Sequence, residues 1–355
     1  MINRECGVFR TTYQADMALY QVPLARLTVL AFAVLFVLVL PLVLESTYLV
    51  WLNVVGLNII AALGLNLLTG FCGQISVGHA AFMAVGAYTA AILVARAGMP
   101  FWVGMISGGA LAAVYGLIVG LPSLRVKGFY LAIATLAAQF ITEWTINHVK
   151  WISGGGFQAA ILVPPPRLGP LVLDTEVEKY YLILATTIVA LAVALNIARS
   201  RIGRAFVAIR DRDVAAEIIG VDIYRYKILA FLISSFYAGV AGALWVYYLG
   251  VANIESFRLV ESIAFLAMII IGGLGSILGT IFGATFVTLL PFALEEVLHA
   301  LKGVLPVADI HTFVAHLRLA VFGGLIVLFL VVEPEGLNRL WRNIKDYFRV
   351  WPFSY

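Results

Sequence analysis

A short charged segment interrupts an otherwise apolar chain and limits what the chain can fold into. Residues 199–227 read RSRIGRAFVAIRDRDVAAEIIGVDIYRYK and contain seven basic and four acidic side chains, 11 of the 42 charged residues in the protein. Long apolar runs flank this segment on both sides. A charged side chain at the centre of a bilayer costs roughly 3 kcal/mol or more. The segment must therefore face water, between stretches that are suited to lipid.

The composition of the whole chain is that of an α-helical membrane protein. The chain is 63% hydrophobic and 12% charged, with a mean hydropathy of +1.02, whereas soluble domains are about 45–50% apolar. Apolar runs such as residues 27–44 are continuous, unlike the alternating strands of an outer-membrane barrel. We predict an all-α, polytopic helical membrane protein. Its basic excess, a net charge of +4, is interpreted as an orientation signal and not as a nucleic-acid site.

The spacing of the apolar runs predicts about ten transmembrane spans, because a helix needs about 20 residues to cross a bilayer. The spans are expected at 27–44, 48–69, 76–96, 101–121, 128–146, 179–198, 228–250, 260–272, 277–298 and 314–332. Residues 27–335 would thus form the transmembrane domain, between an N-terminal segment (1–26) and a C-terminal tail (336–355).

The distribution of basic residues predicts the orientation of these spans. Loops rich in lysine and arginine stay in the cytoplasm, so residues 199–227 are predicted to be cytoplasmic. Ten spans then place both termini in the cytoplasm and the loop 147–179 on the periplasmic side. That loop contains glycine and proline clusters, which prevent one continuous helix.

Two glycine-rich segments break the helical pattern at membrane depth. Residues 70–82 read GFCGQISVGHAAF, and residues 272–283 read GGLGSILGTIFG. Small residues at steps of four let helices pack closely, but paired interruptions are also typical of a transport site. Both interpretations stay open. A helix that starts near Ser76 would present a partly positive end to a substrate carboxylate. His79 is either a hydrogen-bonded structural imidazole or a proton relay.

The sequence offers no energy source of its own. No predicted span has a carboxylate at its middle, where proton- and sodium-driven carriers usually keep one. The P-loop pattern for ATP binding is absent. Neither a metal site nor a cofactor site is predicted, and the scattered histidines form no catalytic cluster, which argues against a membrane enzyme. An ion-coupled carrier and a channel remain as rival classes.

The charged segment contains a short amphipathic helix suited to docking on a partner. Asp213 can accept hydrogen bonds from the first amides of a helix that begins at Val214, and Gly220 can close that helix in a left-handed cap. An apolar stripe is expected from Val207, Val214, Ile218 and Val221. Such a helix fits a groove in a partner protein; the alternative is a solvated connector.

Several motifs in this chain resemble those of a transporter family. Residues 213–220 (DVAAEIIG) resemble the acid–Ala–Ala–x3–Gly loop with which permeases of ABC importers dock on their ATPase, although Val214 separates the acid from the first alanine. Five further segments, in order, resemble branched-chain amino acid permeases of the LivM type: 64–82, 127–137, 200–211, 238–244 and 272–283. The resemblance covers roughly residues 48–335.

The resemblance implies a permease subunit of an ATP-driven importer in the bacterial inner membrane, for branched-chain or related amino acids. Urea or short amides are the alternative substrates. It also implies four kinds of contact: a second permease of the LivH type, two cytoplasmic ATPase subunits, a periplasmic substrate-binding protein and membrane lipid. Phe140 and the glycines at 154–156 depart from the family pattern and leave the substrate open.

The resemblance and the patterns together give two sets of candidate site residues. Coupling to the ATPase is assigned to Arg204, Asp213, Ala215, Ala216, Glu217 and Gly220. The translocation path is assigned to Gly73, Gln74, Ser76, Gly78, His79, Phe82, Tyr130 and Thr135. The proposed movement is a rocking of the spans around residues 73–86, driven by a cytoplasmic helix over residues 205–220.

Overall fold

The computed structural model describes residues 34–123, 129–153, 160–169, 171–300 and 336–350, together with isolated residues near both ends. Several predictions fall outside the described residues. These are the N-terminal segment 1–26, the glycines at 154–156 and most of the tenth predicted span, 314–332.

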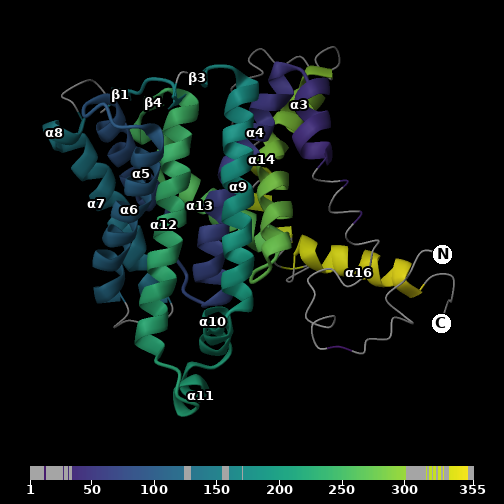
Figure 1. The fold of residues 1–355 in the computed structure, drawn as a ribbon. Helices are drawn as coiled ribbons and strands as arrows, with labels where there is room; N and C mark the ends of the chain where they lie inside the picture. Colours follow the sequence, from purple (N-terminus) through teal and green to yellow (C-terminus); the bar gives the residue numbers. More distant parts are fainter. Residues whose placement is uncertain are drawn as a thin grey trace.

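The described chain is a bundle of long helices with short strands at one end (Figure 1). The first helices are η1 (Leu35–Val39), α3 (Leu40–Val43), α4 (Ser46–Leu65), η2 (Asn66–Phe71), α5 (His79–Ala95), α6 (Phe101–Ser123), α7 (Phe129–His148) and α8 (Lys150–Ser153). The later ones are α9 (Glu176–Arg199), α10 (Arg201–Asp211), α11 (Asp213–Ile218), α12 (Ile223–Leu249), η4 (Ile254–Phe257), α13 (Leu259–Gly272), α14 (Ile277–Ala300) and α16 (Leu337–Val350).

Each predicted span between residues 48 and 298 is a helix in the structure, with ends within five residues of the prediction. The count of about ten spans is not confirmed. Four described helices are long and apolar enough to cross a membrane, namely Ser46–Phe71, Phe101–Leu121, Glu176–Arg199 and Ile223–Leu249. Two shorter apolar helices, His79–Ala95 and Ile277–Ala293, accompany them. The two glycine-rich segments cause part of this difference, because the first delays the start of α5 to His79 and the second ends α13 at Gly272.

The predicted loop 147–179 is more ordered than its glycines and prolines indicated. It contains α8 and the strands β1 (Ile161–Leu162), β2 (Arg167–Leu168) and β3 (Leu171–Val172). β1 pairs antiparallel with β4 (Val251–Ala252), and β2 pairs with β3. These strands have two residues each, and the predicted all-α fold class is confirmed.

The same loop ends earlier than predicted because a capping box starts α9 at Glu176. The hydroxyl of Thr175 accepts a hydrogen bond from the amide of Glu178, whose carboxylate accepts one from the amide of Thr175. Glu176 and Glu178 were predicted in the loop and instead form the first turn of the helix.

Helices α5, α6 and α12 form the tightest part of the bundle, and glycines allow it. A Cβ atom on Gly86 would overlap the backbone of Gly239, and one on Gly108 would lie 2.7 Å from the carbonyl oxygen of Gly86. A Cβ on Gly242 would overlap the backbone of Met83. The close-packing interpretation therefore holds at Gly86, since only a missing side chain permits these contacts.

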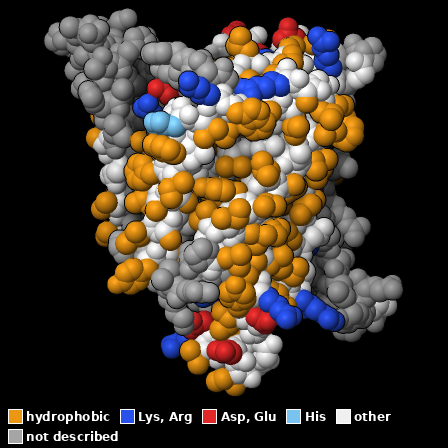
Figure 2. Space-filling view, turned by 90° about the vertical axis from the view of Figure 1, so that its left-hand side faces the viewer, with side chains coloured by type: hydrophobic (Ala, Val, Ile, Leu, Met, Phe, Trp, Pro, Cys, Tyr) orange, Lys and Arg blue, Asp and Glu red, His pale blue; other side chains and the backbone are white. Residues whose placement is uncertain are grey.

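The outer surface of the bundle is apolar over most of its height. Figure 2 shows hydrophobic side chains covering one face between two charged ends. At the lower end a small projection carries acidic and basic side chains with hydrophobic ones at its tip; in Figure 1 this projection is α10 and α11. This distribution is the one expected of an integral membrane protein.

The glycine packing gives a test. Substituting Gly86→Ala places a Cβ against a backbone that cannot move aside, and we expect it to destabilise the chain by about 1–3 kcal/mol. Thermal unfolding of the purified protein in detergent measures the effect. The control is Gly323→Ala, where the new Cβ meets no atom within 4 Å. Equal melting temperatures for the two variants would contradict the packing account.

Candidate functional site

The charged segment folds as two short helices that project from one end of the bundle, α10 and α11 (Figure 1). The single helix expected over residues 205–220 is wrong. Arg212 lies between the two helices in an extended conformation, with φ −157° and ψ 100°, so the helical hydrogen-bond ladder stops there. The projection is a helix–bend–helix unit and not one rod.

The predicted cap of α11 is confirmed. Gly220 has φ +89°, its amide donates to the carbonyl of Glu217 at 2.9 Å, and the Val221 amide donates to the carbonyl of Ala216 at 3.0 Å. This pair of bonds is a Schellman motif, which needs a left-handed residue. At the other end the prediction was off by one residue: Arg212 is the N-cap, α11 begins at Asp213 itself, and the Asp213 carboxylate accepts a hydrogen bond from the Val214 amide at 2.9 Å.

The apolar tip of the projection differs from the predicted stripe. Val214, Ile218 and Ile219 are 63%, 80% and 75% exposed. Val207 and Val221 instead pack against the hydrophobic core, because the bend at Arg212 turns α10 back onto the bundle. Of the two alanines, Ala216 is buried and Ala215 is exposed, as is Glu217.

Beside this tip lies an open groove of about 410 Å³ between α11 and the beginning of α12. Its lining is rich in carboxylates and is made of Asp213, Glu217, Val221, Asp222, Ile223, Tyr224 and Lys227. Three of the predicted coupling residues therefore lie at this groove. Asp213 and Glu217 line it, and Gly220 ends the helix that borders it.

The first glycine-rich segment forms an extended break between η2 and α5. Gly73 has φ +72° and lies against Arg210 of α10, whose Cα would be 3.3 Å from a Cβ at this position. The Val77 amide donates to the Thr135 hydroxyl of α7 at 3.0 Å, and a Cβ on Gly78 would overlap the carbonyl of Thr135. The structure thus brings Gly73, Gly78 and Thr135 together at one break. They come from two of the segments that resemble LivM-type permeases, 64–82 and 127–137.

Asn66 bridges this break to the second one, and the sequence analysis missed it. Its amide nitrogen donates to the Ser276 carbonyl at 3.0 Å and to the Thr280 hydroxyl at 2.7 Å. Its side-chain oxygen accepts a hydrogen bond from the Gly275 amide at 3.0 Å. The one available signal was an asparagine inside an apolar run, at a depth where an unpaired amide is costly.

Arg210 joins the charged projection to both breaks. Its Nη1 atom donates to the carbonyl of Gly70 at 2.9 Å, and a Cβ on Gly275 would lie 2.6 Å from the same nitrogen. Its Nε atom donates to Asp211 at 3.0 Å. The predicted coupling residue Arg204 has a different contact: its Nη1 atom donates to the carbonyl of Arg199 at 3.1 Å, at the end of α9.

The other predicted path residues are mostly buried. The imidazole Nε2 of His79 is 2.9 Å from the carbonyl oxygen of Ala61, which fits the structural interpretation of this histidine. Phe82 packs against Tyr115, and the backbone carbonyl of Gln74 accepts from the Thr69 hydroxyl. Ser76 is fully buried, with no partner for its hydroxyl within the described chain. Tyr130, by contrast, is 69% exposed.

The first turn of α5 is already occupied by protein groups. The Ala80 amide donates to the Ser262 hydroxyl at 2.9 Å, and that hydroxyl donates to Gln139 at 3.2 Å. The amide of Gln139 donates in turn to the Phe257 carbonyl at 2.7 Å. In this conformation the helix end near Ser76 therefore stabilises the contact of α5 with α7 and α13.

The comparison with known proteins now identifies the chain by family. Residues 47–330 match the family model described as branched-chain amino acid transport system / permease component. The chain belongs to this family. The resemblance drawn from the sequence motifs is thereby confirmed, and the chain is an ABC permease component.

Relatives agree with this assignment. The high-affinity branched-chain amino acid transport system permease protein LivM of Escherichia coli K12 is 30% identical over 307 residues, 80% of this chain and 68% of LivM. LivH of the same organism is 24% identical over 293 residues, 78% of this chain and 89% of LivH. Among solved structures, PsaBC from Streptococcus pneumoniae in complex with Fab aligns with 88% of this chain and 99% of that one, at 15% identity and a TM-score of 0.44, a likeness too remote to bear on the fold.

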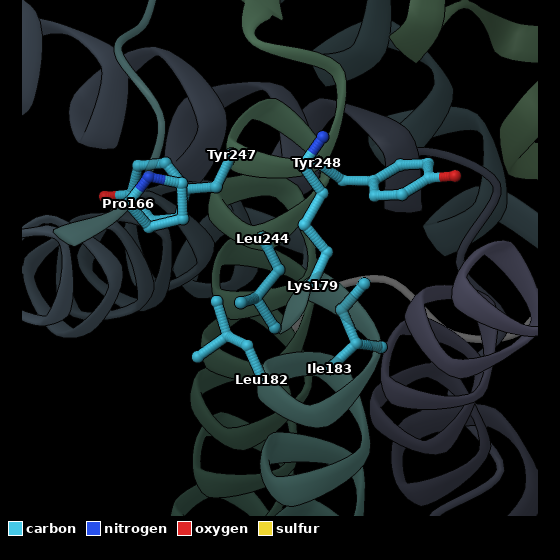
Figure 3. Close-up of a pocket in the computed structure, with 7 residues that line it drawn as sticks. All are labelled: Pro166, Lys179, Leu182, Ile183, Leu244, Tyr247 and Tyr248. Carbon is cyan, nitrogen blue, oxygen red and sulfur yellow. The ribbon is translucent and has the colours of Figure 1, made fainter. Parts of the chain in front are cut away.

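At the end of the bundle that carries the strands, the pocket drawn in Figure 3 is too small for an amino acid. Lys179 and Leu182 of α9 and Tyr247 and Tyr248 of α12 line this pocket, together with Pro166, Ile183 and Leu244. Its volume of about 10 Å³ has room for a single water molecule. The described residues contain no group of side chains that could hold a metal ion.

The bridge made by Asn66 can be tested by stability. Asn66→Ala removes the partner of the Gly275 amide and of the Ser276 carbonyl, so we expect a loss of about 1–3 kcal/mol. Asn66→Asp loses both donors and buries an acid against the Ser276 carbonyl, so it should also be destabilised. Asn196→Ala, at an exposed position of α9, is the control. Thermal unfolding in detergent measures all three, and an unchanged Asn66→Ala would refute the bridge.

Proposed function

We propose that this permease serves an ATP-driven importer that carries branched-chain or related amino acids across the bacterial inner membrane. The observation that carries the proposal is the projection formed by α10 and α11, with its exposed apolar tip and its fixed contact to both helix breaks. Family membership supports the solute class. LivM and LivH are permeases named for branched-chain amino acid transport, and both resemble this chain.

The tip of α11 is the proposed docking site for a cytoplasmic ATPase subunit. Burying a valine or isoleucine side chain contributes about 1.5–3 kcal/mol, so Val214, Ile218 and Ile219 would gain by entering a groove of a partner. The neighbouring carboxylates of Asp213 and Glu217 would add charge complementarity with basic side chains. The Schellman cap at Gly220 fixes the direction in which the helix points.

Arg210 is the proposed connection between this docking site and the transport path. A displacement of α11 moves α10, and α10 carries Arg210, which holds the carbonyl of Gly70 and packs on Gly73 and Gly275. Asn66 ties the same two breaks to each other. A movement at the ATPase would therefore reach both breaks together, as a two-state element requires.

The remaining parts of the assembly follow from the same proposal. The projection and both termini would lie in the cytoplasm, and the end with β1 to β4 would face the periplasm and a substrate-binding protein. A second permease of the LivH type would complete the path, and a second ATPase subunit would dock on it. The proposed path residues remain Gly73, Gln74, Ser76, Gly78, His79, Phe82, Tyr130 and Thr135.

The alternative solutes are urea and short amides, and an uptake assay separates them. In bacteria that lack this gene, supplying the chain should restore uptake of labelled leucine, isoleucine or valine and not of urea. Gly220→Leu, forced into a left-handed conformation that L residues disfavour, should lower that uptake at least about tenfold, since the coupling helix loses its cap.

The matched control for this assay is Gly98→Leu, because Gly98 has the same left-handed conformation and open surroundings at the other end of the bundle. Restored uptake of urea alone would replace the proposed solute. Full uptake by Gly220→Leu would refute the coupling role of α11. Uptake by the purified single chain in liposomes would instead support an ion-coupled carrier.

A separate prediction concerns Arg210. Arg210→Gln removes the charged donor to Gly70 while leaving the tip of α11 unchanged. We expect the ATPases to copurify in normal amounts, and the ratio of ATP hydrolysed to solute transported to rise several-fold. Arg201→Gln, exposed at the other end of α10, is the control. A normal ratio for Arg210→Gln would show that coupling takes another route.

A further inference from the structure

The last described helix, α16, does not run with the bundle. Figure 1 shows α16 leaving the lower part of the bundle and extending sideways, away from the other helices. This lower part is the one nearer to α10 and α11. The helix has 14 residues, about 21 Å at 1.5 Å per residue. It is therefore too short to cross a hydrocarbon core of about 30 Å.

The first turns of α16 are fixed to the second helix break. Gly336, just before the helix, has φ +68°, and a Cβ there would lie 2.6 Å from the Gly273 amide and the Ile271 carbonyl. The ring of Trp341 packs 5.7 Å from that of Phe282 in α14. The orientation of the helix is thus set by packing near its start, and the rest projects away.

The sequence of α16, LNRLWRNIKDYFRV, is divided sharply into two faces. At 100° per residue the apolar side chains from Leu337 to Tyr347 fall within an arc of about 120°, and the basic ones lie on the opposite side. The apolar face consists of Leu337, Leu340, Trp341, Ile344 and Tyr347. Arg339, Arg342 and Lys345 of the basic face are exposed, and so are Leu340, Ile344 and Tyr347 of the apolar face.

We propose that α16 lies in the interface of the inner leaflet and binds anionic lipid headgroups. Its four basic residues outnumber the single acidic Asp346, which gives the helix a net charge of +3. A helix with one apolar and one basic face sinks its apolar side into the boundary of headgroups and acyl chains. Trp341 and Tyr347 suit the same depth, because their rings are both apolar and polar.

The charge pattern favours lipid over a protein partner as the occupant of this surface. The other exposed apolar helix, α11, has two acidic residues and no basic one, so an anionic membrane surface would repel it. α16 has the opposite charge and projects sideways from the bundle. The basic face would contact headgroups while the apolar face continues the lipid-facing surface of the bundle. This inference does not depend on which solute is carried.

Site-directed spin labelling of the full chain in vesicles tests the proposal. Ile344→Cys reports on the apolar face and Asp346→Cys on the polar side, in a Cys6→Ser background where the native Cys72 is buried. In vesicles of phosphatidylcholine with phosphatidylglycerol, the label at 344 should collide more with oxygen than with a water-soluble nickel chelate. The label at 346 should show the reverse.

The charges are tested by R339Q/R342Q/K345Q, whose exposed positions leave the packing near Gly336 intact. Each removed charge should weaken attraction to an anionic surface roughly fivefold. Phosphatidylglycerol should lower nickel access at 344 in the parent chain and have little effect in this variant.

Two results would overturn the proposal. Nickel access that stays high at both positions, with or without phosphatidylglycerol, would place α16 in water. Low access to both oxygen and nickel at 344 would mean that protein covers the apolar face. Unchanged elution on size exclusion shows that each variant is folded.

Discussion

Two helix breaks beside the charged projection leave backbone amides and carbonyls without helical partners, and the neighbouring elements supply side chains that satisfy them. The Asn66 side chain accepts a hydrogen bond from the Gly275 amide and donates one to the Ser276 carbonyl. Arg210 donates a hydrogen bond to the carbonyl of Gly70. Irregular backbone at membrane depth persists only when protein groups or water satisfy it. The breaks can therefore exist only where η2, α10 and α14 meet.

This constraint has a mechanical consequence. Because Arg210 belongs to the charged projection, the side chain that satisfies the first break also attaches that break to the proposed docking helix. A hydrogen bond from a charged donor is worth about 1.5–3 kcal/mol, less here because a third of the Arg210 side chain is exposed. A contact of this strength can stabilise one conformation and still be broken when a partner binds.

Much of the fold could be predicted from the sequence. Continuous apolar runs place a helix at each predicted span between residues 48 and 298, since lipid-facing helices need such runs. The left-handed cap at Gly220 was also predicted, because it depends on local backbone geometry. The single helix over residues 205–220 was wrong because the chain bends at Arg212, although the predicted cap at Asp213 already marked a helix start beside that bend. The stripe that included Val207 and Val221 failed for the same reason.

The candidate site divides along the same line. The sequence by itself determined the membrane class, the position of the two breaks and the amphipathic character of α11, because composition and periodicity express these directly. Only the tertiary structure decided that Asn66 and Arg210 close the breaks, that Tyr130 is exposed and that α16 projects sideways. Those facts depend on contacts between residues up to 214 positions apart, and no local pattern records such pairs.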